Sequence, residues 1–188
     1  RRQRQMCIRD SNMLKQHQIE EVDEDSSLQF FTLLIEHLQN AGYEHYEISN
    51  FCRPDKYSRH NTSYWRGIPY LGCGPSAHSF NGTTREWNVS SIDLYIKGIE
   101  GNQRDFETEN LDQTTRYNEF IITTIRTVWG TPIEKLKQEF GNELWEYCRK
   151  MSAPYLENGK LEIHEGALRL TREGLSLIHI SEPTRPRL

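Results

Sequence analysis

The sequence lacks the features that define several large protein classes. Its 188 residues contain no run near the roughly 18 apolar residues that a membrane helix needs, and mean hydropathy is -0.80 with 27% charged side chains. The four cysteines are scattered, with no CxxC pair and no zinc-type spacing, at Cys7, Cys52, Cys73 and Cys148. We therefore expect a protein without a transmembrane segment or a zinc site, in a reducing cytoplasmic compartment.

The two ends of the chain differ in character from the interior. Residues 1–11 have no periodic spacing of apolar residues and no helix cap. These residues and residues 178–188 both resemble translated sequencing-adapter sequence. We expect both to be foreign tails; the alternative is a natural basic tail and a Pro-rich terminus. The tails hold six of the 23 Lys and Arg residues and two of the 27 Asp and Glu residues. The interior then has 17 basic and 25 acidic side chains and a net charge of -8, which gives no bulk attraction to nucleic acid or anionic lipid.

Periodicity in the first half predicts one helix and one strand. Apolar residues from Leu28 to Leu38 recur at helical spacing, with Ser26 or Ser27 as the expected cap and the acidic residues before them as a loop. Residues 43–49 alternate as a strand does. A helix that leads directly into a strand is typical of an α/β layered fold. Residues 50–82 lose clear period, and their aromatic content favours a functional loop over disorder.

The second half is predicted to hold a separate unit. Residues 93–98 favour a short helix, and residues 102–110 predict a polar connector at the domain boundary. Asp112 or Thr114 is the expected cap of the next helix. Thr131 is then expected to cap a helix that has Pro132 at its first position and ends at Gly141. A further helix over residues 142–159 and a hairpin over residues 161–170 complete the unit.

Three helices followed by a hairpin is the order of a winged-helix domain, which raises the question of DNA binding. Residues 112–175 contain 9 basic and 10 acidic side chains, and the third helix opens with Glu143 and Glu146. A helix that enters a DNA groove relies on Lys and Arg to neutralise phosphates. We therefore expect no nucleic-acid partner, and a packing or lid role for this unit.

One stretch concentrates side chains suited to a flat, partly apolar ligand. Residues 59–79 hold two histidines, the amide of Asn61, the aromatic pair Tyr64 and Trp65, and three glycines. Tyr and Trp rings can stack on a planar ligand while their OH and NH groups find polar partners, and glycine permits close backbone approach. Aromatic residues of an ordinary core and glycines of an ordinary turn would give the same sequence pattern.

Three motifs resemble those of the HemW heme chaperones, relatives of oxygen-independent coproporphyrinogen III oxidase in the radical SAM superfamily. They are Tyr46-Glu47-Ile48-Ser49-Asn50-Phe51, Ser58-Arg59-His60-Asn61-Thr62-Ser63-Tyr64-Trp65, and Tyr70-Leu71-Gly72-Cys73-Gly74-Pro75-Ser76-Ala77-His78-Ser79. The likeness covers about residues 13–177, and the HNxxYW element at residues 60–65 separates the chaperones from the oxidases.

The resemblance implies a fold and a set of cofactors. It implies that residues 12–101 are the C-terminal part of a partial radical SAM (β/α) barrel and that residues 112–177 are a small winged-helix-like α+β domain covering it. The intact parent would bind heme, S-adenosylmethionine and a [4Fe-4S] cluster held by a CxxxCxxC loop. This sequence has no CxxxCxxC. The resemblance therefore implies a fragment that cannot hold the cluster or begin radical chemistry.

The same resemblance implies a heme site around His60, and each residue of this site has an ordinary structural role as its alternative. His60 would ligate heme iron, or it is a loop histidine bonded to a carbonyl. Arg59 would pair with a propionate, or it forms a surface ion pair. Asn61 would orient His60 or the ligand, or it forms an Asx-turn. Tyr64 and Trp65 would stack on the porphyrin face, or they are core aromatics.

The glycine loop and the strand before it are further candidates. By resemblance, Gly72, Gly74 and Ala77 line the S-adenosylmethionine or substrate pocket, and the alternative is an ordinary turn. His78 is a second ligand candidate, with a buried, hydrogen-bonded histidine as an equal competitor. Further upstream, Glu47 and Asn50 contact a ligand or fix a turn. Cys52 and Cys73 are more often small core residues than ligands.

The function implied is a cytoplasmic chaperone that delivers heme to membrane respiratory proteins. Peripheral contact with the membrane during delivery and self-association into a homodimer are open alternatives. The competing function is a radical SAM oxidase that decarboxylates porphyrinogen propionates. The HNxxYW element favours the chaperone. Whether the intact parent is also an enzyme stays open. This chain alone is not expected to be catalytic.

Overall fold

The computed structural model describes residues 12–13, 15–16 and 23–175, so both predicted foreign tails lie outside the described residues. The named helices after residue 22 are α2 (Glu24–Asn40), α3 (Arg59–Trp65), α4 (Ile92–Glu100), α5 (Gln113–Ile125) and α6 (Ile133–Glu157), and residues 172–175 are also helical. The strands are β1 (Glu44–Glu47), β2 (Asn50–Cys52), β3 (His78–Phe80), β4 (Thr84–Asn88), β5 (Phe106–Asn110), β6 (Thr131–Pro132), β7 (Leu161–His164) and β8 (Ala167–Leu170). They form three small antiparallel sheets, β1-β2, β3-β4-β5 and β6-β8-β7, so the fold is mixed α and β as expected.

Helix α2 begins earlier than the sequence predicted. Its cap is Asp23, whose carboxylate accepts a hydrogen bond from the Ser26 N–H at 2.9 Å, so the expected cap at Ser26 or Ser27 is wrong. Asp25, expected in a loop, lies instead in the first turn, where the helix dipole favours negative charge. Phe31 and Ile35 form the buried face. None of the helices in the described ranges has the length and apolar character needed to cross a bilayer.

The predicted helix–strand unit ends in a hairpin. Strand β1 turns back at once and pairs antiparallel with β2, with Glu44 opposite Cys52. Residues 50–82 hold more regular structure than predicted, because they contain β2, α3 and β3. Helix α3 has only seven residues, which is too short to show an apolar period in the sequence.

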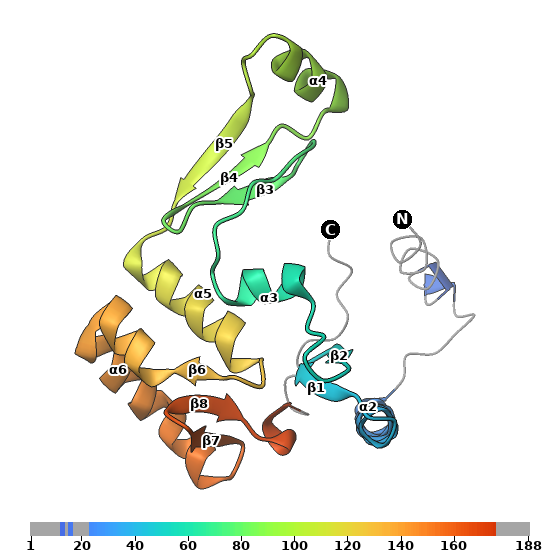
Figure 1. Ribbon diagram of the computed structural model, residues 1–188, viewed down its shortest axis with the longest axis vertical. Helices are drawn as coiled ribbons and strands as arrows, with labels where there is room; N and C mark the ends of the chain where they lie inside the picture. Colours follow the sequence, from blue (N-terminus) through green and yellow to red (C-terminus); the bar gives the residue numbers. More distant parts are fainter. Residues whose placement is uncertain (1–11, 14, 17–22, 176–188) are drawn as a thin grey trace.

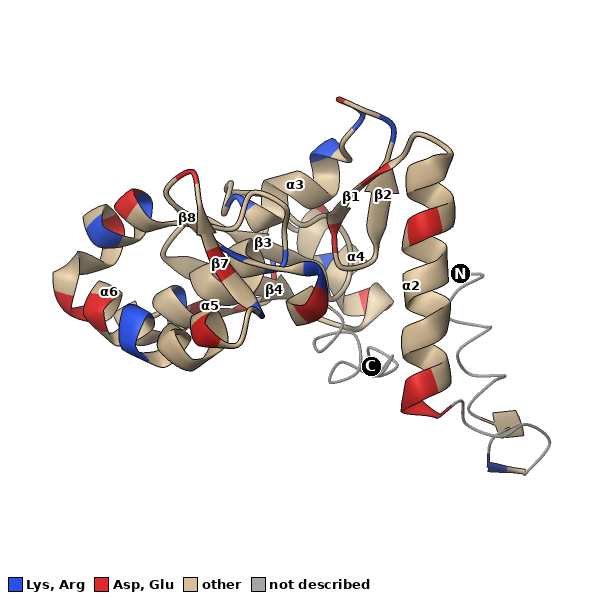
Figure 2. Cartoon of the chain, turned by 90° about the horizontal axis from the view of Figure 1, so that it is seen from below, with Lys and Arg blue, Asp and Glu red and all other residues tan. Residues whose placement is uncertain are grey.

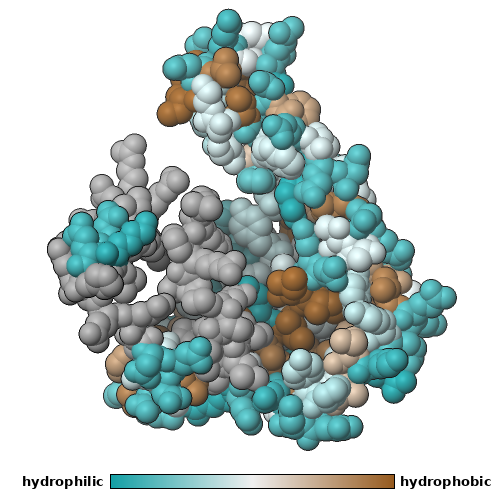
Figure 3. Space-filling model, turned by 180° about the vertical axis from the view of Figure 1, so that it is seen from behind, coloured by the Kyte–Doolittle hydropathy of each residue, from teal (hydrophilic) through white to brown (hydrophobic). Residues whose placement is uncertain are grey.

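Strands β3, β4 and β5 together with α4 form an arm that extends away from the other elements (Figure 1). The segment predicted as a connector, residues 102–110, supplies β5, which pairs with β4 from Thr84 opposite Asn110 to Asn88 opposite Phe106. Every β5 side chain is exposed, so backbone pairing and not an apolar pattern forms this strand, and the sequence carried no signal for it. The short helix predicted here is α4, capped by Ser91. Apolar side chains lie exposed on α4, and brown side chains are visible on the arm in Figure 3.

The C-terminal unit follows its predicted order with one correction. Asp112 caps α5 as expected, accepting a hydrogen bond from the Thr115 N–H at 2.7 Å. Thr131 is not a helix cap; it lies fully buried in β6, and its hydroxyl is 2.7 Å from that of Thr124. Gly141 interrupts α6 with φ 86°, at the position where the sequence predicted the helix to end.

A single core holds the C-terminal unit together. Its buried members are Tyr117, Leu136, Phe140, Cys148, Leu161 and Leu168. The predicted hairpin is present as β7 and β8, with Leu161 opposite Leu170, and β6 adds to the β8 edge. Basic and acidic residues are interspersed along α6 (Figure 2). This mixed charge gives α6 no basic face of the kind that DNA phosphates attract.

Candidate functional site

Helix α3 carries the HNxxYW motif. Ser58 caps the helix, because its Oγ accepts a hydrogen bond from the Asn61 N–H at 3.3 Å. One helical turn separates His60 from Tyr64, and their ring centroids lie 4.9 Å apart, edge to face. The Tyr64 ring lies 4.7 Å from that of Tyr70. His60 therefore stands at the end of a row of aromatic rings.

A groove with a volume of about 670 Å³ lies beside this row, within the range of small-molecule sites. Side chains from α3, β3, β4, α5 and α6 line it. Six of them are aromatic: Tyr64, Trp65, Tyr70, Phe80, Phe120 and Phe140. Such a wall suits a flat apolar ligand, because aromatic rings offer large contact area at low cost in conformational entropy.

The groove contains only part of the site predicted from the sequence. Tyr64 and Trp65 line it, whereas Arg59, His60 and Asn61 do not. Arg59 and His60 are exposed on α3, so His60 belongs to a helix and not to a loop. Sequence reasoning missed the opposite wall on α5 and α6, because those residues come next to the motif only through folding.

Trp65 also belongs to an aromatic cluster. Its ring lies 5.8 Å from that of Tyr46 on β1. The Tyr46 hydroxyl accepts a hydrogen bond from the Ser58 N–H at 3.3 Å, at the start of α3. Trp129, which follows α5, lies 6.2 Å from Tyr46 and receives the Arg66 guanidinium over its ring. Trp65 is thus both a groove residue and a packing residue, and its stacking on a porphyrin stays a prediction.

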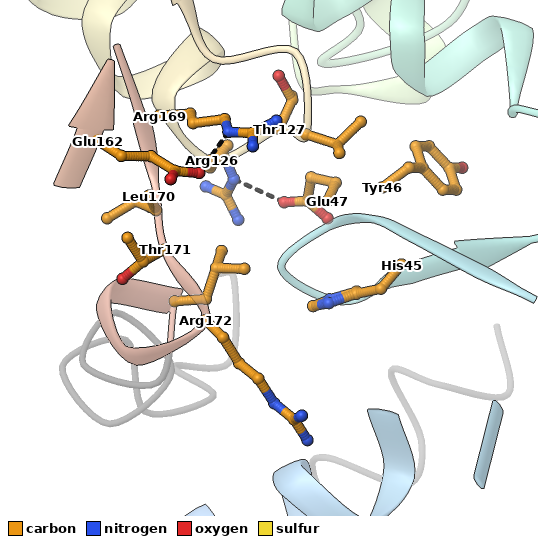
Figure 4. Close-up of a pocket in the computed structure, with 12 residues that line it drawn as sticks. His45, Tyr46, Glu47, Arg126, Thr127, Glu162, Arg169, Leu170, Thr171 and Arg172 are labelled. Carbon is orange, nitrogen blue, oxygen red and sulfur yellow. Dashed lines mark hydrogen bonds and ion pairs between the residues drawn. The ribbon is translucent and has the colours of Figure 1, made fainter. Parts of the chain in front are cut away.

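Beneath α3 lies a buried carboxylate network (Figure 4). The side chain of Glu47 is 2% exposed, and its Oε1 lies 2.6 Å from Nε of Arg126 at the end of α5. Its Oε2 accepts hydrogen bonds from the Ser49 N–H and the Asn50 side-chain amide. Asn50 in turn accepts a hydrogen bond from the Asn61 amide at 3.3 Å. Glu47 and Asn50 therefore fix the β1–β2 turn, and the network joins α5 to α3 through it.

The glycine loop bonds to its own chain. Gly72 N–H donates to Ser79 Oγ at 3.0 Å, and Gly74 N–H donates to the Tyr95 hydroxyl at 3.0 Å. The Asn88 amide donates to the carbonyls of both glycines. A Cβ on Gly72 would lie 2.2 Å from the His78 carbonyl oxygen, so this glycine allows close backbone packing. These two amides are therefore engaged within the protein and do not point to a ligand.

The other residues predicted around the glycine loop are absent from the groove lining in the described part of the chain. Ala77 N–H donates to the Gly74 carbonyl at 3.2 Å. His78 is exposed on β3, 5.9 Å from the Trp87 ring, which contradicts the alternative of a buried histidine. Gly72, Gly74, Ala77 and His78 therefore lie on the arm side of the groove, and a role for them in a larger pocket stays a prediction.

The described cysteines do not fit an iron–sulfur cluster. Such a cluster is held by several thiolates that converge on it, but Cys52 is buried in β2, Cys148 is buried in α6 and Cys73 is exposed in the glycine loop. Within residues 12–13, 15–16 and 23–175, no group of three His, Cys, Asp or Glu side chains is arranged to hold a metal ion.

A second cavity, of about 210 Å³, lies between the β1–β2 hairpin and the end of β8. Its walls include Glu47 with Arg126, Glu162 with Arg169, and Arg172, which pairs with Glu36 at 2.9 Å (Figure 4). These arginines already have carboxylate partners. We therefore interpret this cavity as part of the interface between the hairpin and the C-terminal unit.

His45, on the wall of this second cavity, gives a pH-dependent expectation. Burial lowers the pKa of His45, and its Nε2 lies 3.0 Å from the Ile48 carbonyl oxygen. The folded protein thus disfavours the charged ring, so stability is retained above the ordinary histidine pKa of about 6.5 and falls as the pH drops below it. We expect His45→Gln to reduce the difference between urea midpoints at pH 7.5 and pH 5.5. An unchanged difference would contradict this role of His45, and exposed His164→Gln is the control.

Comparison with known proteins defines the class. The HemN C-terminal domain model matches residues 111–177. The solved structure of coproporphyrinogen III oxidase (HemN) from Escherichia coli, a radical SAM enzyme, has a TM-score of 0.57 and 18% identity, over 79% of this chain and 38% of that one. The fold is thus that of the C-terminal region of HemN-type proteins.

Curated relatives show a second similarity, to heme chaperones. The heme chaperone HemW of Mycobacterium tuberculosis is 31% identical over 153 residues, which are 81% of this chain and 37% of the relative. HemW of Bacillus subtilis is 24% identical over 87% of this chain and 43% of the relative. The chain is similar to HemW proteins over most of its own length, in agreement with the motifs, and it spans less than half the length of these relatives.

Proposed function

We propose that this chain forms the heme-contacting wall of a HemW-type chaperone. The observation that carries the proposal is that Tyr64 and Trp65 of the HNxxYW motif line the same groove as the aromatic residues of α5 and α6. A groove of about 670 Å³ walled by aromatic rings suits a porphyrin. In this proposal heme is the cargo, and the whole parent protein delivers it to membrane respiratory proteins.

The C-terminal unit has a supporting role in this proposal. In it, the three helical segments and the hairpin form a winged-helix-like domain, and α5 and α6 provide the far wall of the groove. We propose that this unit covers a partial radical SAM barrel in the parent, near the glycine-loop residues Gly72, Gly74, Ala77 and His78. The parent's [4Fe-4S] cluster and S-adenosylmethionine would be held by residues that this sequence does not contain.

The HemN-type fold favours a second candidate, a radical SAM enzyme that acts on coproporphyrinogen. The two candidates differ in what happens to the ligand. A chaperone binds heme and releases it unchanged, whereas the oxidase decarboxylates a porphyrinogen. Turnover of coproporphyrinogen by the intact parent would favour the enzyme.

His60 provides the sharpest test of the proposed function. It is exposed, and its ring lies 4.9 Å from that of Tyr64, which lines the groove. Because a neutral imidazole binds heme iron, we expect His60→Ala to weaken heme binding about tenfold, or about 1.4 kcal/mol, and to shift the Soret band. Heme titration followed by absorbance measures both.

The matched control is His164→Ala, which removes a half-exposed histidine from β7 outside the groove. It should leave both the affinity and the Soret band unchanged. If His60→Ala behaved like this control, iron ligation by His60 would be wrong. If neither Tyr64→Ala nor Trp65→Ala altered the affinity, the groove itself would be the wrong site.

A further inference from the structure

The charged side chains of the groove are not all neutralised. Four cationic side chains line it, Arg66, Arg85, Arg116 and Lys135, against two carboxylates, Glu119 and Glu139. Arg85 pairs with Glu119 at 2.6 Å and Lys135 pairs with Glu139 at 3.6 Å. The remaining two cations are guanidinium groups, and Arg66 is placed over the Trp129 ring at 5.4 Å.

Arg116 differs from Arg66 in burial, because Arg66 is exposed. Arg116 is half-buried in α5, and its Cζ lies 5.9 Å from the centroid of the Phe140 ring, which also lines the groove. Within the described residues, no carboxylate lies within 4.0 Å of its guanidinium nitrogens. The two carboxylates one turn away on the same helix segment are engaged elsewhere, since Asp112 accepts a hydrogen bond from the Thr115 N–H and Glu119 pairs with Arg85.

This placement gives the groove a chemical preference. A guanidinium at the edge of an aromatic wall presents its donors to a carboxylate, and the pairing is strengthened where the wall excludes water. A neutral ligand would leave the charge of Arg116 unpaired in a partly desolvated position, which is unfavourable. The groove therefore favours a ligand that combines a flat apolar body with a carboxylate at its edge.

We propose that Arg116 binds a carboxylate of the tetrapyrrole and makes the groove selective for the free acid over its ester. This inference rests on the proposed function and deepens it. In sequence, Arg116 lies 50 residues or more beyond the HNxxYW motif, and nothing in its local pattern marks it as a ligand residue. Arg59, the propionate partner expected from the sequence, does not line the groove.

The test compares iron protoporphyrin IX with its dimethyl ester on the complete 188-residue chain. Both ligands present the same ring and iron, and only the carboxylates differ. We expect the chain to bind the free acid at least tenfold more tightly, and Arg116→Gln to bind both ligands at the level of the ester. Arg149→Gln is the control, because Arg149 is exposed on α6, pairs with Glu146 and does not line the groove. Circular dichroism establishes that each variant is folded.

The outcomes separate this inference from the function on which it rests. The role of Arg116 is overturned if the chain binds heme and its ester equally well, or if Arg116→Gln still prefers the free acid. Either result leaves heme binding intact. Loss of discrimination in Arg149→Gln as well would show a general charge effect and would also overturn it. Failure of the folded chain to bind either ligand overturns the proposed function.

Discussion

Replacing Glu47 with alanine is expected to destabilise the chain by about 2 to 4 kcal/mol, because the substitution removes a buried partner from a cation. The Glu47 carboxylate is 2% exposed and serves Arg126, the Ser49 amide and Asn50 together. Without it, the Arg126 side chain, which is 19% exposed, loses its carboxylate in a partly desolvated position. Urea unfolding followed by tryptophan fluorescence measures the loss.

The chain offers a control with similar pairing geometry and different burial. Glu146 accepts hydrogen bonds from Arg149 at 2.7 and 2.9 Å, but both side chains are more than half exposed. Exposed ion pairs contribute little to stability. Glu146→Ala should therefore lower the free energy of unfolding much less than Glu47→Ala does. Equal losses in the two variants would mean that burial does not determine the importance of Glu47.

Leu136→Ala is expected to lower the free energy of unfolding by about 3 kcal/mol, because it opens a cavity in the buried core. Leu136 is 0% exposed and packs in the cluster that includes Phe140 and Leu168. Its neighbours Lys135 and Glu139 line the groove, so the loss of packing should also weaken heme binding. Urea unfolding and heme titration of the same variant test both consequences.

Leu71→Ala is the matched control for this loss of packing. Leu71 is 74% exposed, so truncating it removes little buried area and should leave the urea midpoint nearly unchanged. A small effect of Leu136→Ala would show that this part of the chain relaxes around the cavity.

Much of the fold was predictable where a periodic pattern coincided with a cap or a turn. Asp112 before α5, the short helix α4 and the β7–β8 hairpin are all marked this way. Strand β5 was not, since its pairing with β4 depends on backbone hydrogen bonds that no side-chain pattern announces. Helix α3 was missed because seven residues are too few for a period to emerge.

The candidate site was predictable only on the side that the motif occupies. Tyr64 and Trp65 are adjacent in sequence and were identified by the HNxxYW pattern. Phe140 and Arg116 join them in the groove only because α5 packs against α3 and α6 packs against α5. For Glu47 and Asn50 the sequence left ligand contact and turn formation open, and the bonds from Ser49 and Asn50 to Glu47 show that they stabilise the turn.

The link between Glu47 and Arg126 also bears on the order in which the chain folds. Its two residues lie 79 positions apart, and beside it the Val128 N–H donates to the Tyr46 carbonyl. Joining such distant segments costs chain entropy that is not recovered until the loop closes, so contacts of this kind form late in folding. The C-terminal core depends on nearer neighbours and can form beforehand. We therefore expect the groove, which needs both parts, to be completed after the C-terminal core.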